Sequence, residues 1–438
     1  MKPLDTDDPR VVGPFELLAR LGAGGMGVAY LARRIPLDGL ADELAAAYNL
    51  IELDEAEPYE SRLVVVKMIQ PSLLDGEPQA RERFGREIDA VRAVVSDRVP
   101  ALIAFEENPA AARPWFAMDY IAGPSLHTMV KEHGTFGIGP YAALGLALVD
   151  ALRAIHGANL LHRDLKPANV VLGPDGPVVL DFGLAVLIER ASEQALTKTG
   201  VGMGTRHYMP LEQLKDAKHV ERPADVYALG ATLFFALTGR PPYPYVPLLS
   251  DPKWEGVEPA FLPLLAKILV AAPGQRPHLD AVEDGLLTLL AEADLTAELA
   301  AEELRTLVEA AGLTPQLPAE VLADPVDPAV QEVARRAVEA DQPDVDPGFY
   351  GMVDTDEIEM AADADEPAPA SAPHPPTLVD PIPAQPAAPE PGPSTTSYRL
   401  QPPRRRQEPL PAAADRPPRA AQNVAARLRK AYAHRGNL

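Results

Sequence analysis

The sequence predicts an α+β protein with a strand-rich first lobe and a helical second lobe. Short apolar runs and glycine turns occupy the chain as far as residue 121, and a long apolar helix is predicted at residues 141–157. Residues 160–184 alternate short apolar strands with tight turns, and helical spacing prevails from residue 210 to about residue 290. This change of pattern along one stretch of chain indicates two lobes of different class within one unit.

The elements of the first lobe follow from local pattern. Residues 15–32 predict a strand, a glycine turn and a second strand, and the β-branched run at residues 63–69 predicts a buried strand. Residues 114–121 predict a further strand, and the apolar spacing of residues 81–95 predicts a helix. Residues 33–62, with a short helical run and a cluster of acids, interrupt this order as an insertion.

Composition divides the rest of the chain. Residues 1–13 carry several aspartates and no apolar core, so we expect them to be disordered. Residues 291–342 predict a helical extension without a chemical motif. Residues 343–418 are rich in Pro, Ala and acidic residues and bury too little apolar surface to offset their chain entropy, which predicts disorder. Residues 419–438 form a basic segment with the pattern of a short amphipathic helix.

Charge and residue usage exclude several classes of function. A formal net charge of −23 argues against a nucleic-acid-binding body, because a polyanion would be repelled. The absence of cysteine excludes disulfides, cysteine-ligated metals and thiol catalysis. The apolar stretches at residues 141–155 and 261–272 are too short or too interrupted to span a bilayer, and residues 1–14 show no secretory signal. We therefore expect a cytoplasmic protein without a transmembrane segment.

A glycine-rich turn at residues 21–30 is the first candidate for chemistry. Glycines let the backbone approach phosphate oxygens and present free N–H groups. Taken alone the spacing fits a dinucleotide-binding turn equally well, but that turn opens into a helix, whereas a strand is predicted here. The candidate nucleotide-binding residues of this turn are Leu21, Gly22, Gly24, Gly25 and Gly27.

Lys67 lies at the end of the buried apolar run. A lysine there is costly unless its charge is paired, although a lysine on an edge strand that points to solvent would satisfy the same pattern. Glu87, on the predicted helix, is the candidate partner, and the pair would hold the ammonium against nucleotide phosphates.

The motif His-Arg-Asp-Leu-Lys-Pro-Ala-Asn at residues 162–169, followed by Asp-Phe-Gly at 181–183, carries the most specific signal. With these motifs the chain resembles the eukaryotic-type serine/threonine protein kinases, and its Gly-Gly-Met-Gly turn resembles their bacterial branch. The resemblance covers residues 14–290, with the motifs in family order. It implies the bilobal protein-kinase fold, with ATP and Mg²⁺ (or Mn²⁺) as cofactors and serine or threonine side chains of proteins as acceptors.

The resemblance also implies roles for single residues. Asp164 would accept the proton of the attacking hydroxyl, and Lys166 would neutralise charge on the transferred phosphoryl group. Asn169 and Asp181 would supply oxygen ligands to the metal ion. His162 is expected to be structural rather than a proton donor.

The adenine site is implied in the same way. Ala29 and Val65 would line its roof and Val171 its floor, with Met118 at the gatekeeper position; the hinge would comprise Asp119, Tyr120 and Ile121. The family usually has valine at the first roof position and alanine at the second, so the sizes are exchanged here. A volume-conserving exchange would preserve the pocket, although independent drift at two tolerant positions explains the same residues equally well.

Three further residues match structural positions of the family. Glu212 and Arg276 match a buried ion pair, and Asp225 matches the aspartate that braces the catalytic loop. The segment ending at Glu212 reads Pro-Leu-Glu where the family has Ala-Pro-Glu, so the shape of the substrate-docking floor is open.

Regulation and alternatives complete the expectations. Arg163 next to Asp164 implies control by phosphate on the activation loop, with Thr197 and Thr199 as candidates for autophosphorylation in trans within a homodimer. The basic segment at residues 419–438 would dock on a partner, on the acidic body or on a membrane surface, or remain a solvated extension. The alternatives to a protein kinase are a pseudokinase scaffold and a small-molecule kinase; a phosphotransfer assay separates them.

Overall fold

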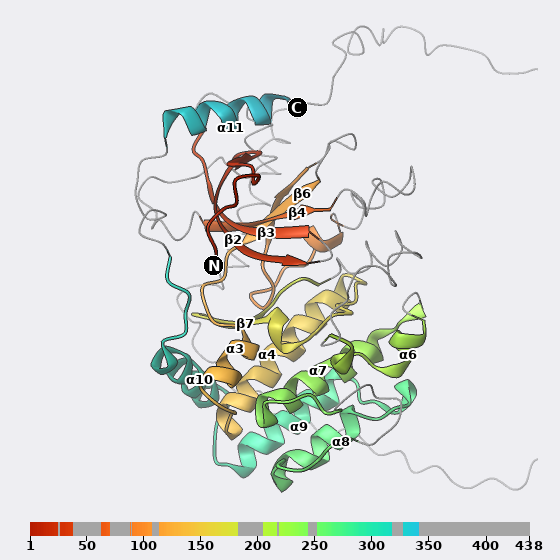
Figure 1. Ribbon diagram of the computed structural model, residues 1–438. Coiled ribbons are helices and arrows are strands. Elements are labelled where there is room, and N and C mark those ends of the chain that lie inside the picture. The colour runs from red at the N-terminus through yellow and green to blue at the C-terminus, as the bar shows by residue number, and fades with distance from the viewer. Residues whose placement is uncertain are drawn as a thin grey trace, which may run out of the picture. The chain divides into compact units, whose positions relative to one another are not determined.

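The computed structural model describes residues 1–24, 27–37, 63–70, 88, 90–106, 114–182, 205–216, 219–243, 252–317 and 327–340. The first lobe is a six-stranded antiparallel sheet in the order β1-β2-β3-β4-β6-β5 (Figure 1). Its strands are β1 (Val11–Val12), β2 (Phe15–Gly24), β3 (Gly27–Arg34), β4 (Leu63–Ile69), β5 (Leu102–Phe105) and β6 (Trp115–Asp119). The strands predicted at residues 15–32, 63–69 and 114–121 are confirmed.

Successive side chains of β4 lie on opposite faces of the sheet. Val64 and Val66 are fully buried in a cluster with Phe15 and Trp115 on one face. Val65 and Lys67 point to the opposite face, because successive strand residues alternate. One face of the sheet therefore forms a core, and the other presents residues toward the second lobe.

The expectation that residues 1–13 are disordered is wrong. Val11 and Val12 pair with β2, and the backbone of Lys2 exchanges hydrogen bonds with that of Arg20. Asp8 accepts hydrogen bonds from the Arg20 guanidinium and the Tyr30 hydroxyl, both at 2.7 Å. The aspartates that suggested a solvated segment include a charge partner for the sheet.

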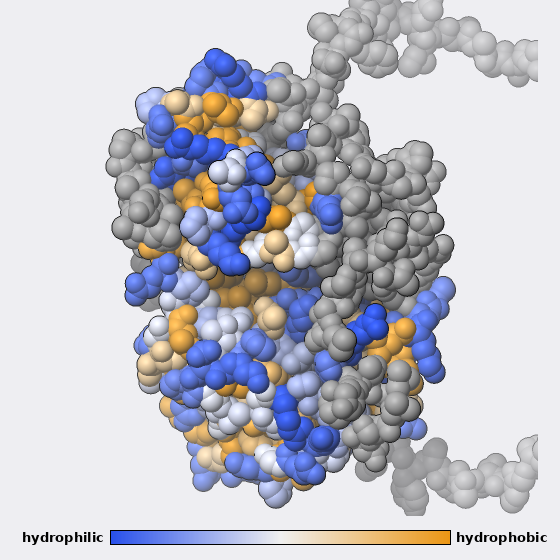
Figure 2. Space-filling model, in the orientation of Figure 1, coloured by the Kyte–Doolittle hydropathy of each residue, from blue (hydrophilic) through white to orange (hydrophobic). Residues whose placement is uncertain are grey.

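Where the structure describes it, the second lobe is mainly helical, with a hairpin of β7 (Val170–Gly173) and β8 (Gly176–Val179). Its helices are α3 (Leu126–Glu132), α4 (Ile138–Gly157), α6 (Leu211–Lys215), α7 (Arg222–Thr238), α8 (Leu262–Ile268), α9 (Leu279–Glu292) and α10 (Ala297–Ala311); α11 (Pro328–Ala340) follows. On the face drawn in Figure 2, hydrophilic residues surround smaller hydrophobic patches. Among the described residues, α4 alone is long and apolar enough to cross a membrane, yet 67% of its apolar window is buried inside the protein, as in a core helix.

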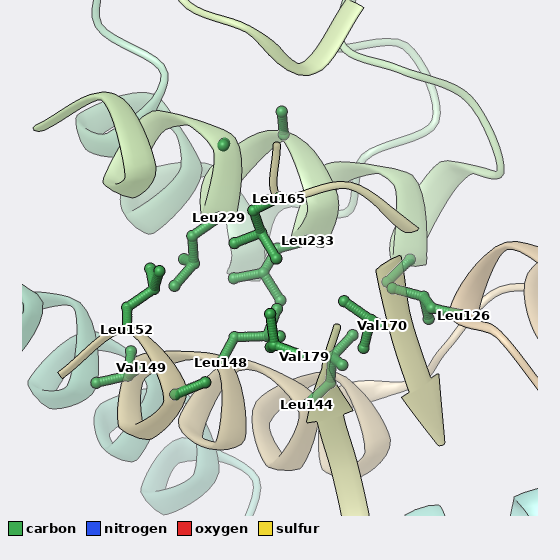
Figure 3. Packing of buried hydrophobic residues seen from close by; sticks show 14 of the residues in the cluster. Leu126, Leu144, Leu148, Val149, Leu152, Leu165, Val170, Val179, Leu229 and Leu233 are labelled. Atoms are coloured by element: carbon green, nitrogen blue, oxygen red, sulfur yellow. The ribbon is translucent and has the colours of Figure 1, made fainter. Parts of the chain in front are cut away.

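The core of the second lobe anchors the segment that follows α4. Leu148 of α4 and Leu233 of α7 lie in one buried cluster with Leu165 and Val170, which come from that segment and from β7 (Figure 3). A fully buried leucine contributes about 2 kcal/mol relative to an exposed one. Leu165 thus fixes the depth of the loop that carries the polar residues on either side of it.

Candidate active site

The catalytic loop, residues 162–169, alternates buried and accessible positions. Leu165, Pro167 and Asn169 are buried, whereas Asp164 and Lys166 are partly exposed. The apolar side chains pull the loop onto the core, so that Asp164 and Lys166 must face outward. Sequence pattern and packing together therefore aim the acid and the lysine away from the second lobe's interior.

Hydrogen bonds join the polar residues of this loop. The Lys166 ammonium donates to Asp164 Oδ2 at 2.6 Å. The Asn169 amide nitrogen donates to the backbone oxygen of Asp164 at 2.8 Å and to its Oδ2 at 3.2 Å. The backbone oxygen of Asn169 accepts from the N–H of Leu180 at 2.8 Å, which holds the chain next to Asp181 against the loop.

Lys67 and Asp181 form a link between the lobes. The Lys67 ammonium donates to Asp181 Oδ1 at 2.8 Å, with the lysine side chain 9% exposed. Burial alone would raise the pKa of Asp181, but the charge and hydrogen bond of Lys67 outweigh it and hold that pKa below its usual value. Glu87, the partner expected from the sequence, lies outside the described residues, so that pairing stays a prediction; Asp181 is a partner that the structure shows.

Asn169 and Asp181 fit a divalent cation. The amide nitrogen of Asn169 is committed to Asp164, which leaves its side-chain oxygen as the atom that can coordinate a cation. Asp181 is held ionised by Lys67. Hard oxygen donors of this kind suit Mg²⁺ or Mn²⁺. Within the described residues no group of three or more acidic or histidine side chains surrounds a metal position, so phosphate oxygens and water would complete the shell.

The roof residues lie on one face of the first lobe's sheet. Ala29 pairs with Lys67, and Val65 pairs with Leu31 on one side and Met118 on the other. Ala29 and Val65 are thus diagonal neighbours on adjacent strands, close enough to share one packing surface. Both are partly exposed, as roof residues over an open site must be.

The glycine turn runs close to β4. A Cβ atom on Gly27, whose φ is +139°, would lie 1.9 Å from the Met68 carbonyl oxygen, so no other residue fits. A Cβ on Gly22 or Gly24 would meet nothing within 4 Å, so the backbone there borders open space. Gly25 lies outside the described residues.

The hinge follows β6. The Asp119 N–H donates to Ala101 O at 3.1 Å, and its carboxylate accepts the Ala101 N–H at 3.1 Å, so this residue is tied to the body of the lobe. Tyr120 and Ile121 are partly exposed, and Val171 on β7 is buried beneath. Leu21 lies near the end of β2.

Asp225 braces the catalytic loop from below. Its carboxylate accepts hydrogen bonds from the backbone N–H groups of His162 and Arg163, both at 2.9 Å, and from His156 Nε2 at 2.8 Å. Burial would raise the pKa of Asp225, but the bond from His156 and the neighbouring N–H groups hold it below its usual value. Arg163 adopts a φ of +64°, a costly conformation for a non-glycine residue that these bonds help to hold.

Sequence reasoning missed His156 and Gln213. His156, in the last turn of α4, bonds Asp225, while Gln213 donates to the backbone oxygen of Arg163 at 2.6 Å. A buried histidine in the last turn of a largely apolar helix was a usable signal, since a buried polar group requires a partner. Nothing in the local pattern distinguishes Gln213.

The Glu212–Arg276 pair is present. The guanidinium contacts both carboxylate oxygens, also donates to three backbone oxygens, and stacks over Tyr227 with its central carbon 4.9 Å from the ring centre. Its side chain is almost fully buried. The pair joins α6 to the segment before α9 and touches no catalytic atom.

Comparisons with known proteins place the chain in a family. A protein-family model, the protein kinase domain, matches residues 56–284, more than half of the chain. Serine/threonine-protein kinase AfsK of Streptomyces coelicolor is 36% identical over 305 residues, which cover 68% of this chain and 33% of the relative. The probable serine/threonine-protein kinase PkwA of Thermomonospora curvata is 38% identical over 243 residues, 56% of this chain and 29% of the relative.

The chain spans about a third or less of the length of these relatives. Among solved structures, the kinase domain of Mycobacterium tuberculosis PknI aligns with a TM-score of 0.46 and 24% identity, covering 63% of this chain and 97% of that one. The family match spans the catalytic loop, Lys67 and Asp181. The chain belongs to the protein kinase domain family.

Proposed function

We propose that the chain is an ATP-dependent protein kinase that transfers the γ-phosphoryl group to serine and threonine hydroxyls of proteins. The observation that carries the proposal is one connected set of polar contacts. Lys67 bonds Asp181, the chain next to Asp181 bonds Asn169, and Asn169 and Lys166 both bond Asp164. A phosphate-binding cation, two oxygen ligands and a carboxylate base within one such set are the parts that phosphoryl transfer requires.

The proposed chemistry assigns each group one task. The acceptor hydroxyl oxygen attacks the γ-phosphorus, the bond to the β-phosphate oxygen breaks, and Asp164 takes the hydroxyl proton. Lys166, 2.6 Å from Asp164, is placed to neutralise charge on the transferred group. Lys67 holds the phosphates and keeps Asp181 ionised. A divalent cation bound by Asn169 and Asp181 would supply further neutralisation of phosphate charge.

Protein hydroxyls are the proposed acceptors for two reasons. The matched relatives carry the name serine/threonine-protein kinase, and Lys166 stands two residues after Asp164, the arrangement of that class. Autophosphorylation at Thr197 or Thr199 in a homodimer stays a prediction, because both threonines lie outside the described residues. The cytoplasmic location and a docking partner for residues 419–438 likewise stay predictions.

The test is transfer of radiolabelled phosphate from γ-labelled ATP by the full chain to itself and to a generic protein substrate, followed by phosphoamino-acid analysis. We expect phosphoserine and phosphothreonine, and a loss of at least about a hundredfold in Asp164→Asn. Asp150→Asn is the matched control, because Asp150 lies exposed on α4 and pairs with Arg153. Nucleotide binding without transfer would indicate the pseudokinase alternative instead, and transfer only to small molecules would exclude protein acceptors.

A further inference from the structure

Among the described residues, two helices follow the region matched to the kinase family. The first, α10, packs against α4 of the second lobe and buries Ala300, Leu304 and Val308, which recur every four residues along one face. Its N-terminus is capped by Thr296, whose hydroxyl accepts the Leu299 N–H. This helix therefore belongs to the body of the second lobe.

The second helix, α11, packs against the first lobe instead. Val330, Ala334 and Val338 repeat the four-residue spacing and are buried. Val330 and Ala334 form a cluster with Ile35, and Val338 joins the core that contains Phe15 and Trp115; Figure 1 shows α11 beside the sheet.

The start of α11 is fixed by polar contacts as well. The Asp327 side chain accepts the Ala329 N–H at 2.9 Å, as an N-cap does, and Pro328 suits the first helical position. Arg10 lies 3.9 Å from Asp327 and 3.7 Å from Glu16 of β2, so the charges match across the contact. The extension is thus attached to both lobes.

Leu317 lies on the chain between these two attachments. It packs against a small buried group that we call the roof cluster, Ala19, Leu31 and Leu63. Leu21 of the glycine turn and Tyr120 of the hinge pack against the same cluster.

The strand register places the roof cluster on the nucleotide side of the sheet. Leu31 pairs with Val65, and Leu63 lies two residues before Val65 on β4, so both share a face with the roof residue. Leu317 therefore packs on a continuation of the surface that is proposed to form the roof over adenine.

We propose that α10, Leu317 and α11 together act as a strap that sets nucleotide affinity in cis, with Leu317 as a positioning residue for Leu21 and Tyr120. The inference rests on the proposed function, because it assumes that nucleotide binds under this roof. Attachment at α10 and α11 keeps Leu317 at a high effective concentration beside the roof cluster. Packing there restricts the glycine turn and the hinge to the positions that nucleotide requires. Binding then costs less conformational entropy, because these segments are already ordered.

The first test replaces Leu317 and measures nucleotide binding directly, by titration calorimetry of the full chain with Mg-ADP. We expect Leu317→Ala to weaken binding about three- to tenfold, since a few methylene groups of packing are lost. The KM for ATP should rise by the same factor while kcat at saturating ATP changes less than about twofold. Leu299→Ala, the same change at a position of α10 that is 53% exposed, should bind like the parent.

The second test releases α11 without touching Leu317. Val338→Asp places a charge in a fully buried position, whereas Val333→Asp places it at a position that is 53% exposed on the same helix. Only Val338→Asp should reproduce the binding loss of Leu317→Ala. Thermal unfolding of both variants shows whether the kinase fold is retained, and Leu317→Ala keeps the proposal testable if Val338→Asp does not fold.

The coupling between nucleotide binding and docking of α11 must be reciprocal. If the strap strengthens nucleotide binding, nucleotide must strengthen docking of α11 by the same factor. Hydrogen exchange of amides in residues 328–340 should therefore slow when Mg-ADP is added to the parent and not when it is added to Leu317→Ala. A parent that binds nucleotide as Leu317→Ala does, without a change in α11 exchange, overturns the strap; a parent that binds no nucleotide overturns the proposed function itself.

Discussion

Asp225→Asn is the sharpest single test of how the catalytic loop is held. The substitution keeps the size of the side chain and removes its charge and one of its acceptor oxygens. Oδ2 accepts hydrogen bonds from His156 and the His162 N–H, and Oδ1 accepts one from the Arg163 N–H. An asparagine can place its oxygen at the Oδ2 position and keep the first two bonds. Its NH₂ group then takes the Oδ1 position and faces the Arg163 N–H, so that two donors meet.

The cost follows from these contacts. Losing a bond to a charged acceptor costs about 1.5–3 kcal/mol, and a buried N–H without a partner costs about 1–3 kcal/mol. We take about 4 kcal/mol together. The described residues number about 250. An unfolding entropy of about 2.1 cal/mol/K per residue then gives roughly 0.5 kcal/mol/K, so that Tm falls by about 8 °C.

Asp225→Asn should also lower kcat, by more than the fall in Tm alone would cause. Without its bond to Asp225, the strained backbone of Arg163 at a φ of +64° can relax, and Asp164 moves with it. A displacement of about 1 Å costs on the order of a hundredfold in kcat. The KM for ATP should change less than about threefold, because the Lys67–Asp181 contact does not depend on Asp225.

The assay is thermal unfolding by circular dichroism, with steady-state phosphotransfer on the same preparations. Asp280→Asn is the matched control: its carboxylate is 85% exposed and bonds Arg153 at the surface. The control should shift Tm by less than about 1 °C. If Asp225→Asn unfolds at the temperature of the parent and retains its kcat, then Asp225 does not brace the loop.

Three further outcomes are expected. Val65→Ala should weaken nucleotide binding about threefold or more by opening a gap in the roof, and unchanged affinity in calorimetry would remove the idea that Ala29 and Val65 compensate for each other. Burial lowers the pKa of His162 below its usual value of about 6.5, so below that pH the unfolded chain binds a proton there that the folded chain does not. Stability should therefore fall as pH drops below about 6.5. The Tm of His162→Gln should depend less on pH between 7.5 and 5 than that of the parent, and an identical pH profile would contradict this. Arg276→Lys should lower the urea midpoint by an amount equivalent to about 2–4 kcal/mol, because a lysine cannot span both oxygens of Glu212, and an unchanged midpoint would show that the paired geometry is dispensable.

Much of the site was predictable because each motif fixes its own backbone. The loop around Asp164 packs Leu165 inward, and that single apolar residue sets the direction of its neighbours. The strand carrying Val65 and Lys67 was readable from its β-branched run, and alternation then placed both side chains on one face. Local patterns of this kind need no knowledge of distant contacts.

Partners across long sequence distances were less predictable. Lys67 was expected to pair with Glu87, which lies outside the described residues, so that pairing stays a prediction; the contact with Asp181, 114 residues away, was not expected. Charge complementarity alone admits both carboxylates, since either would lower the cost of burying the ammonium. The acidic N-terminus shows the same difficulty: Asp8 has its partners on β2 and β3, which no local pattern reveals.

The extension after residue 290 shows where a motif-based boundary and a physical one diverge. Apolar residues every four positions in α10 and α11 predict that each helix buries one face. Because the hydrophobic effect is non-directional, this pattern does not predict which surface of the protein covers that face. Charge helps to determine which surface α11 covers, because Asp327 at the start of α11 contacts Arg10 beside the sheet. Ile35 of the first lobe is fully buried in a cluster with α11, so a domain that ended with the last kinase motif would leave that apolar surface open to water. By the criterion of burial, the folded unit that contains the first lobe includes α11.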